Sequence, residues 1–107
     1  MTEKMVNPLT VEQVISSQDA PDVSVAKIEL DGTNSKVKNT KVFATYSIVA
    51  GTGYFLVWNG QDCELKEVEA GDIMRIPAGT PYQDMGKMTM ICINYPAFNP
   101  EQVEFLD

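Results

Sequence analysis

Hydrophobic and polar residues alternate along most of this chain, which is the pattern of β-strands that bury one face. Between Val23 and Leu30 the even-numbered positions carry Ser, Ala, Ile and Leu, and the following Asp-Gly-Thr-Asn is typical of a turn. The stretch from Val37 to Trp58 is rich in β-branched and aromatic residues and is interrupted by Gly51-Thr52-Gly53. It therefore predicts a strand, a bend and a second strand.

The dipeptide Asn59-Gly60 is the strongest short hairpin signal in the chain, because both central residues of a type I′ turn need positive φ angles. The return strand is expected to begin at Cys63 and to end at Ala70-Gly71. Three more strands are predicted, at Asp72 to Ile76, Lys87 to Asn94 and Gln102 to Leu106. So many short strands at nearly regular spacing predict an all-β fold, either an antiparallel sandwich or a barrel.

A helical signal is present near the N-terminus. Thr10 is followed three residues later by Gln13, which is the spacing of a capping box. A short helix from Thr10 to Ser17 is therefore predicted, ended by the turn formers Asp19-Ala20-Pro21. We expect residues 1–22 to form an N-terminal arm with this helix and residues 23–107 to form the β-barrel domain.

Length and charge restrict the function. A chain of 107 residues is expected to be one domain, and its net charge of -7 repels polyanions, so nucleic-acid binding is not expected. Neither a membrane-spanning run nor a secretory signal is seen, and a cytoplasmic location is predicted. Cys63 and Cys92 lack metal-site spacing and are expected to be reduced thiols.

The sequence of residues 71–84, GDIMRIPAGTPYQD, resembles the second motif of the cupins. Cupins are small β-barrels that usually place three histidines and a glutamate around a metal ion. Their second motif is glycine, five residues, proline, one residue, glycine, two residues, histidine, three residues and asparagine. Gly71, Pro77 and Gly79 fit it in register, with Tyr82 on the histidine position and Gly86 on the asparagine position.

The first cupin motif is matched at its two glycines, Gly32 and Gly51, and its ligand positions fall on Lys38, Thr40 and Ala44. The resemblance covers roughly Val23 to Phe105, and the C-terminal sequence looks like that of small bacterial cupins. It implies a cupin-like double-stranded β-helix, or jelly-roll barrel. It also implies a homodimer, because such barrels commonly pair through their sheets.

Every metal ligand of the two motifs is replaced in this chain, which has no histidine. A catalytic metal needs several imidazole or carboxylate ligands at about 2.0 to 2.2 Å. Lysine, threonine, alanine and tyrosine do not supply that set, and a protonated lysine repels a cation. We therefore predict a barrel that holds no metal and no other cofactor.

A ligand site is predicted at the barrel mouth. Lys38, Thr40 and Tyr46 share one parity, so along a single extended strand they face the same side as the core residues that follow. Tyr82 is included in the predicted site because it occupies the histidine position of the second motif. Arg75 is included because it lies inside an otherwise apolar strand. The predicted ligand-binding residues are therefore Lys38, Thr40, Tyr46, Arg75 and Tyr82.

Each of these residues also has a simpler interpretation. Tyr82 either donates a proton or hydrogen bond to a ligand, or fills the barrel with its hydroxyl paired to backbone. Lys38 either pairs with an anionic ligand or extends past the rim into water. Arg75 is either an inward anion anchor or an outward surface residue, and its parity cannot be followed across Pro77.

Three functions follow from these alternatives. The first is a metal-free protein that binds a small polar or ring-containing molecule in the barrel mouth. The second is a metal-independent isomerase, cyclase or lyase, in which Tyr82 exchanges a proton and Lys38 stabilises a developing anion. The third is a degenerate barrel that serves as an assembly surface. An interior cavity of roughly a few hundred Å³ would favour the first two functions, and a filled interior would favour the third.

Overall fold

The computed structural model describes residues 9–15, 22–96 and 103–106, and these residues form β-strands and turns without a helix. The strands are β1 (Leu9–Ile15), β2 (Ser24–Thr33), β3 (Val37–Asn39), β4 (Phe43–Asn59), β5 (Asp62–Glu69), β6 (Ile73–Ile76), β7 (Pro81–Tyr95) and β8 (Val103–Phe105). The fold is therefore all-β, as predicted. No helix of the size and apolarity needed to cross a bilayer occurs in this part of the chain.

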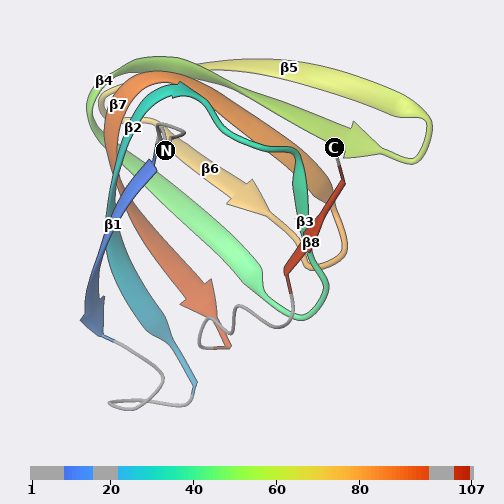
Figure 1. Cartoon of the computed structure of the whole chain (residues 1–107), viewed down its shortest axis with the longest axis horizontal. Helices are drawn as coiled ribbons and strands as arrows, with labels where there is room; N and C mark the ends of the chain where they lie inside the picture. Colours follow the sequence, from blue (N-terminus) through green and yellow to red (C-terminus); the bar gives the residue numbers. More distant parts are fainter. Residues whose placement is uncertain (1–8, 16–21, 97–102, 107) are drawn as a thin grey trace, which may run out of the picture.

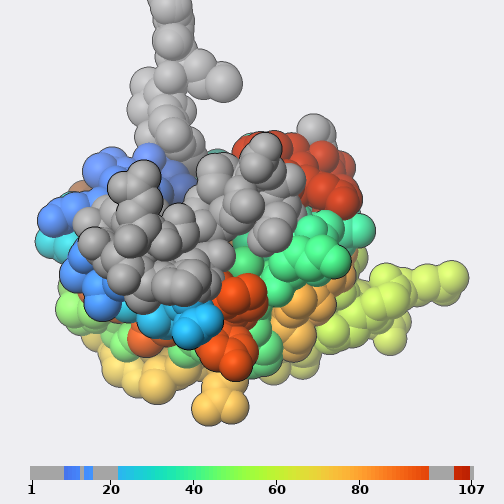
Figure 2. Space-filling view, turned by 90° about the horizontal axis from the view of Figure 1, so that it is seen from below, coloured from blue at the N-terminus to red at the C-terminus, as the bar shows by residue number. Residues whose placement is uncertain are grey.

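All strand pairs are antiparallel, and the two longest strands, β4 and β7, form the centre of the sheet. β4 also pairs with β5 and β6, while β7 also pairs with β2 and β3; β1 and β8 extend the sheet beyond β2 and β3. Figure 1 shows β2, β4 and β7 curling together, so that one sheet folds over on itself. The β4–β5 hairpin projects from the body of the molecule (Figure 2).

The core lies inside this curl and follows the alternation of the sequence. In β2 the buried positions are Ser24, Ala26, Ile28 and Leu30, as the pattern predicts. The two central strands β4 and β7 contribute Phe55 and Met90 to this core, and both side chains have no measurable exposure. A hairpin also forms at this dipeptide, but its two-residue turn is Gly60-Gln61 and not Asn59-Gly60, because Asn59 pairs with Asp62; Gly60 has a φ angle of 68°.

The predicted N-terminal helix is wrong. Residues 9–15 form β1, which pairs antiparallel with β2 from Leu9 opposite Leu30 to Ile15 opposite Val25. A capping-box spacing is a local signal, and here hydrogen bonding to an open strand edge overrides it. Ser16 and Ser17 of the predicted helix lie outside the described residues, and the division into 1–22 and 23–107 remains a prediction.

The break in the long central stretch lies earlier than predicted. β4 continues through Gly51 and Gly53, and its register with β7 shifts between Ile48 and Ala50 instead. The chain is interrupted at residues 40–42, where the Oδ1 atom of Asn39 accepts hydrogen bonds from the backbone N–H groups of Lys41 and Val42. Such a side-chain turn ends one strand and reorients the next.

A row of three glycines crosses the curled sheet. Gly86 of β7 lies opposite Gly32 of β2 on one side and Gly53 of β4 on the other. A Cβ atom on Gly86 would lie 2.6 Å from the Cα of Gly53 and 2.7 Å from the carbonyl oxygen of Thr52. Gly86 also has a φ angle of 129°, which other residues rarely adopt. The close approach of β4 and β7 therefore requires glycine here.

We predict that Gly86→Ala destabilises the protein by at least about 2 kcal/mol, because strained φ and backbone overlap act together. Gly60→Ala is the matched control, since a Cβ there meets nothing within 4 Å and only the positive φ remains. That strain costs about 1 kcal/mol. Urea unfolding of both variants tests this, and equal losses would contradict the close-approach explanation.

Candidate functional site

The curled sheet encloses a cavity of about 350 Å³. Its walls are mainly apolar and come from β1, β2, β3, β4, β7 and β8. The polar side chains that face it are Asn34, Asn39, Tyr46, Tyr82, Asp84 and Asn94. An apolar hollow of this size with a few converging polar groups is the usual form of a small-molecule site. The interior is therefore not filled, which favours the first two predicted functions over the third.

Two tyrosine hydroxyls meet at the cavity wall. The hydroxyl oxygens of Tyr46 and Tyr82 lie 2.7 Å apart, and either hydroxyl can donate the hydrogen bond. The ring of Tyr46 lies 5.3 Å from the ring of Phe55, the ring of Tyr82 stacks on Phe55 at 6.5 Å, and the two tyrosine rings are 6.0 Å apart. Three aromatic rings thus hold the hydroxyl pair in place.

Both phenols stay protonated at neutral pH. Burial raises the pKa of Tyr46 well above its ordinary value, and the nearby Tyr82 raises it further. Burial also raises the pKa of Tyr82, although the hydrogen bond with Tyr46 opposes this in part. Because a protonated phenol retains its O–H, the pair can give a hydrogen bond or a proton, but does not act as a base.

A buried carboxyl group lies next to the pair on the same face of β7. Asp84 is only 2% exposed, and its Oδ1 atom accepts a hydrogen bond of 3.1 Å from the side chain of Asn34. The backbone N–H of Asn34 donates to the carbonyl of Asp84 at 3.0 Å, so two hydrogen bonds fix this turn against β7. Burial raises the pKa of Asp84, and the bond from Asn34 lowers it in part.

Cys92 and Asn94 continue the inward face of β7. The thiol of Cys92 donates to the Oδ1 atom of Asn94 at 3.5 Å. Burial raises the pKa of the Cys92 thiol to about 12, against the opposing effect of its hydrogen bonds with Tyr46 and Asn94. Cys92 is therefore a protonated, unreactive thiol. Both cysteines are free, as predicted, and Cys63 is exposed.

The structure brings together two of the five predicted site residues. Tyr46 and Tyr82 line the cavity, whereas Lys38 and Thr40 are absent from its walls. The turn at residues 40–42 breaks the single strand on which the parity argument relied, so Val37 and Asn39 face the cavity instead. The ammonium of Lys38 lies 3.4 Å from the carboxylate of Glu104 on the neighbouring β8. The inward orientation predicted for Lys38 and Thr40 is corrected accordingly.

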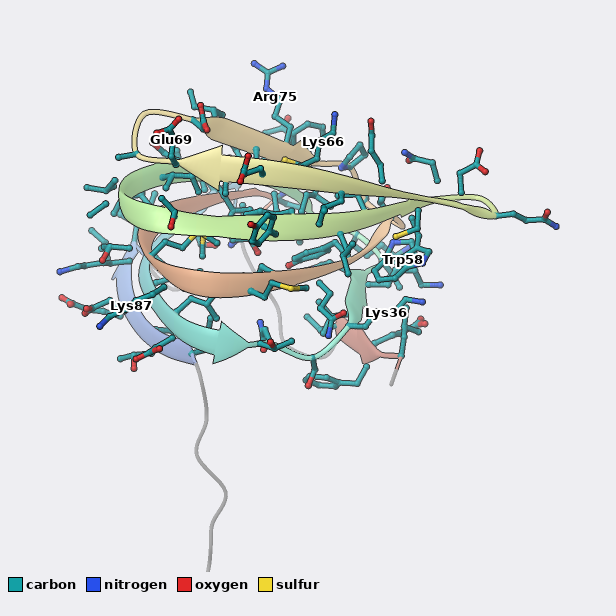
Figure 3. The ribbon with its side chains drawn as sticks, turned by 90° about the horizontal axis from the view of Figure 1, so that it is seen from above. Lys36, Trp58, Lys66, Glu69, Arg75 and Lys87 are labelled. Carbon is teal, nitrogen blue, oxygen red and sulfur yellow. The ribbon has the colours of Figure 1, made fainter. Side chains whose placement is uncertain are left out.

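Arg75 faces away from the cavity. Its side chain is exposed on β6 and extends outward from the ribbon in Figure 3. The side chain of Ile76, the next residue along the strand, is buried, as the alternation of a β-strand requires. Of the two orientations left open by the sequence, the structure has the outward one.

Sequence reasoning missed four polar residues of the cavity: Asn34, Asn39, Asp84 and Asn94. Asp84 and Asn94 share the parity of Tyr82 along β7, so that signal was available once the strand was extended back to Pro81. Asn34 was assigned only to a turn. Asn39 has the opposite parity to Lys38, so the argument that placed Lys38 inside implied an outward Asn39.

The donor set of the cavity does not fit a metal ion. Among the described residues no three His, Cys, Asp or Glu side chains come together. The two candidate ligands on the cavity wall are Asp84 and Cys92, whose raised pKa values favour their protonated forms. A metal ligand must be deprotonated, so these residues are poorly suited to bind one.

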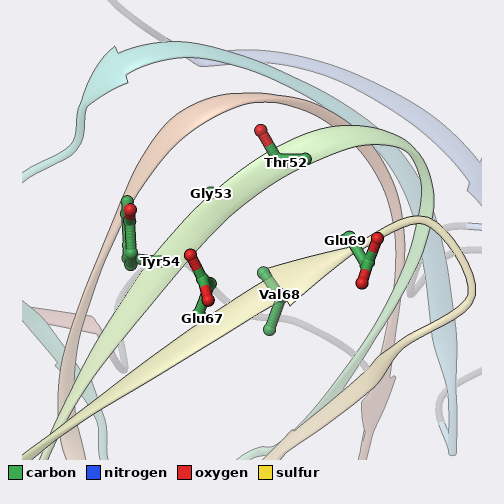
Figure 4. A pocket seen from close by; sticks show the side chains of 6 residues that line it. All are labelled: Thr52, Gly53, Tyr54, Glu67, Val68 and Glu69. Carbon is green, nitrogen blue, oxygen red and sulfur yellow. The ribbon is translucent and has the colours of Figure 1, made fainter.

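A second hollow of about 320 Å³ lies over the β4–β5 pair (Figure 4). Its lining comes from residues that are directly opposite each other in the two strands, including Tyr54 with Glu67 and Thr52 with Glu69. These four side chains are exposed on one face of the pair. Gly53 and Val68 complete the lining, and the acidic groups of this hollow alone do not form a site.

Comparisons with solved structures identify the fold. No protein-family model and no curated protein matches the sequence. The structure is similar to Pac13 from Streptomyces, solved with uridine as a histidine-to-glutamine variant. The identity is 21%, the match covers 96% of this chain and 82% of that chain, and the TM-score is 0.84. A second structure of Pac13, in which the protein is described as a unique nucleoside dehydratase, is also similar. The identity is 22%, the match covers 97% of this chain and 83% of that chain, and the TM-score is 0.79.

Oxalate decarboxylase from Bacillus subtilis is also similar. The identity is 12%, the match covers 95% of this chain and 29% of that chain, and the TM-score is 0.83. These neighbours show that the chain has the cupin fold, as the glycine and proline skeleton of its motifs predicted.

We predict that the stability contributed by Asp84 depends on pH. Because its pKa in the folded state is raised, the folded protein binds the Asp84 proton more tightly than the unfolded chain does. This contribution is complete below the ordinary pKa of about 4 and is lost as the pH rises through the raised value. Asp84→Asn, which keeps an acceptor for Asn34, should therefore gain stability relative to the parent between about pH 4 and pH 7.

Urea unfolding of both proteins at several pH values measures this difference. Asp62→Asn, on the exposed β4–β5 hairpin, is the control for the loss of one negative charge. A difference between Asp84→Asn and the parent that stays constant with pH would contradict the raised pKa.

Proposed function

We propose that this protein binds a small, polar, ring-containing molecule in its cavity, without a metal ion. The observation that carries this proposal is the Tyr46–Tyr82 hydroxyl pair, held by aromatic packing on the wall of an otherwise apolar cavity. When one hydroxyl donates to the other, the second still has a proton to give. The pair therefore offers a ligand both a donor and acceptor lone pairs.

The cavity walls suit a planar ligand. Apolar side chains from both halves of the curled sheet face each other across the cavity. Its volume of about 350 Å³ is within the range of small-molecule sites. A ring buries apolar area against these walls, while its polar edge meets hydroxyl and amide groups. Burial supplies affinity and the hydrogen bonds supply orientation.

Nucleosides are the first class of ligand to test. Pac13 shares the fold across nearly the whole of this chain, was solved with uridine and is described as a nucleoside dehydratase. At this level of identity its ligand is a proposal for the present protein. The acidic net charge of -7 is consistent with a small-molecule partner rather than nucleic acid, and we retain the prediction of a cytoplasmic protein.

We predict that Tyr82→Phe weakens uridine binding about five- to tenfold, because one hydrogen bond to the ligand is lost. Tyr95→Phe is the matched control, since Tyr95 lies on the same strand but is 67% exposed and outside the cavity. Isothermal titration calorimetry with and without EDTA measures both the loss and the metal independence. Equal affinity of the parent and Tyr82→Phe, or loss of binding in EDTA, would contradict the proposal.

A metal-independent lyase, isomerase or cyclase is the second candidate, and Asp84 is the observation that favours it. A buried carboxyl group with a raised pKa, on the cavity wall beside Tyr82, is a suitable group for proton exchange. Asp84 thus replaces Lys38, which pairs with Glu104, in the catalytic interpretation. Product analysis of nucleosides incubated with the protein distinguishes an enzyme from a binder.

We also propose a homodimer formed through the outer face of the sheet. Ile93 of β7 lies between Val25 of β2 and Thr45 of β4, and Tyr95 lies opposite Phe43. Phe43, Ile93 and Tyr95 are exposed, so this face presents apolar side chains to solvent. Apolar patches of this kind are common at protein interfaces.

Light scattering tests the dimer. We predict that the parent is a dimer at micromolar concentration and that Ile93→Lys is a monomer, since a buried unpaired charge opposes association. Leu65→Lys on the exposed face of β5 should leave the mass unchanged. A monomeric parent would contradict this interface.

A further inference from the structure

The charges of the residues that line the cavity restrict which ligands can bind, in addition to the limit set by the cavity volume. We infer that the site selects an uncharged ligand that carries a ring carbonyl, and that it discriminates against the phosphorylated form of the same molecule. This inference rests on the proposed function, because it concerns the same cavity. It follows from two observations: the cavity wall contains acids but no basic residue, and one buried amide faces the cavity with its donor unused.

Among the described residues that line the cavity, none is lysine or arginine, and the chain has no histidine. Four lining side chains can ionise, and all are acids: Tyr46, Tyr82, Asp84 and Cys92. An anion that enters the cavity loses its hydration and meets no cation in return. Burial of an uncompensated charge is strongly unfavourable, so a neutral molecule is favoured over its anionic analogue.

Two lysines that flank the lining residue Val37 are engaged elsewhere. Lys38 pairs with Glu104 at 3.4 Å. The ammonium of Lys36 lies 4.0 Å from the centre of the Trp58 ring, and Figure 3 shows both side chains on the same side of the molecule. A ligand phosphate would have to compete with the carboxylate of Glu104 for Lys38, in a protein whose overall field already repels anions.

Asn94 is the second observation. It is 8% exposed and lines the cavity, and its Oδ1 atom accepts the hydrogen bond from Cys92. Its Nδ2 group donates to no residue in the part of the chain that the structure describes. Buried polar groups are generally hydrogen-bonded, so this donor is suited to an acceptor on the ligand. A carbonyl oxygen on an uncharged heterocycle supplies that acceptor without adding charge.

Calorimetry with uridine and uridine monophosphate as probes, at low ionic strength, tests the inference. We expect the parent to bind uridine at least tenfold more tightly than the monophosphate. Phe105→Lys places a cation at a lining position that is 73% exposed, where folding tolerates it, and should reduce this ratio severalfold. Leu106→Lys, next in the chain but not on the cavity wall, is the control and should leave the ratio unchanged.

Asn94→Asp tests the carbonyl recognition separately. It replaces the donor with an acceptor of the same shape and should weaken uridine binding at least tenfold. Circular dichroism and a cooperative unfolding transition confirm that each variant is folded.

The outcomes separate the two levels of the proposal. Uridine binding with equal or tighter binding of the monophosphate overturns the charge selectivity and leaves the proposed function standing. An unchanged ratio in Phe105→Lys also overturns the charge selectivity, and unchanged uridine binding in Asn94→Asp overturns the carbonyl recognition. If the folded parent binds neither probe, the proposal of nucleoside binding fails and this inference fails with it.

Discussion

Removal of water from acidic side chains without a compensating cation is the constraint on which the site depends. Tyr46, Tyr82, Asp84 and Cys92 all face one cavity, and burial raises the pKa of each. Burial therefore works against the ionised forms that a metal ligand needs. The cavity thus presents polar groups that are better suited to a small molecule than to a metal ion.

The curled sheet makes this arrangement possible. β7 alone supplies Tyr82, Asp84, Cys92 and Asn94 to the cavity, because every second residue of a strand faces the same way. β4 passes alongside and adds Tyr46. Gly53 and Gly86 let the backbones of β4 and β7, the two strands that supply most of the polar lining, approach closely where the sheet curls.

Much of the fold follows from the sequence. A linear pattern encodes local geometry. Local geometry accounts for the alternation in β2, the hairpin at Asn59-Gly60 and the spacing of Gly71, Pro77 and Gly79. The N-terminal strand was not predictable in this way, because its partner β2 determines its conformation. A capping-box spacing carries no information about an open sheet edge.

The site was only partly predictable, for a similar reason. Tyr46 and Tyr82 lie within regular strands, where parity gives the direction of a side chain. Lys38 precedes the turn that Asn39 stabilises and Thr40 is the first residue of that turn, which reverses the parity on which their assignment relied. Parity along β7 places Asp84 and Asn94 on the same face as Tyr82, but a carboxyl or amide group in a strand does not by itself reveal whether it is buried.

The most direct test of ligand binding at the tyrosine pair is a crystal structure of the protein soaked with uridine. We predict electron density for the nucleoside inside the cavity, with a polar atom within hydrogen-bond distance of the Tyr46 or Tyr82 hydroxyl. Density for uridine only on the outer surface, or side chains that fill the cavity completely, would contradict the proposed site.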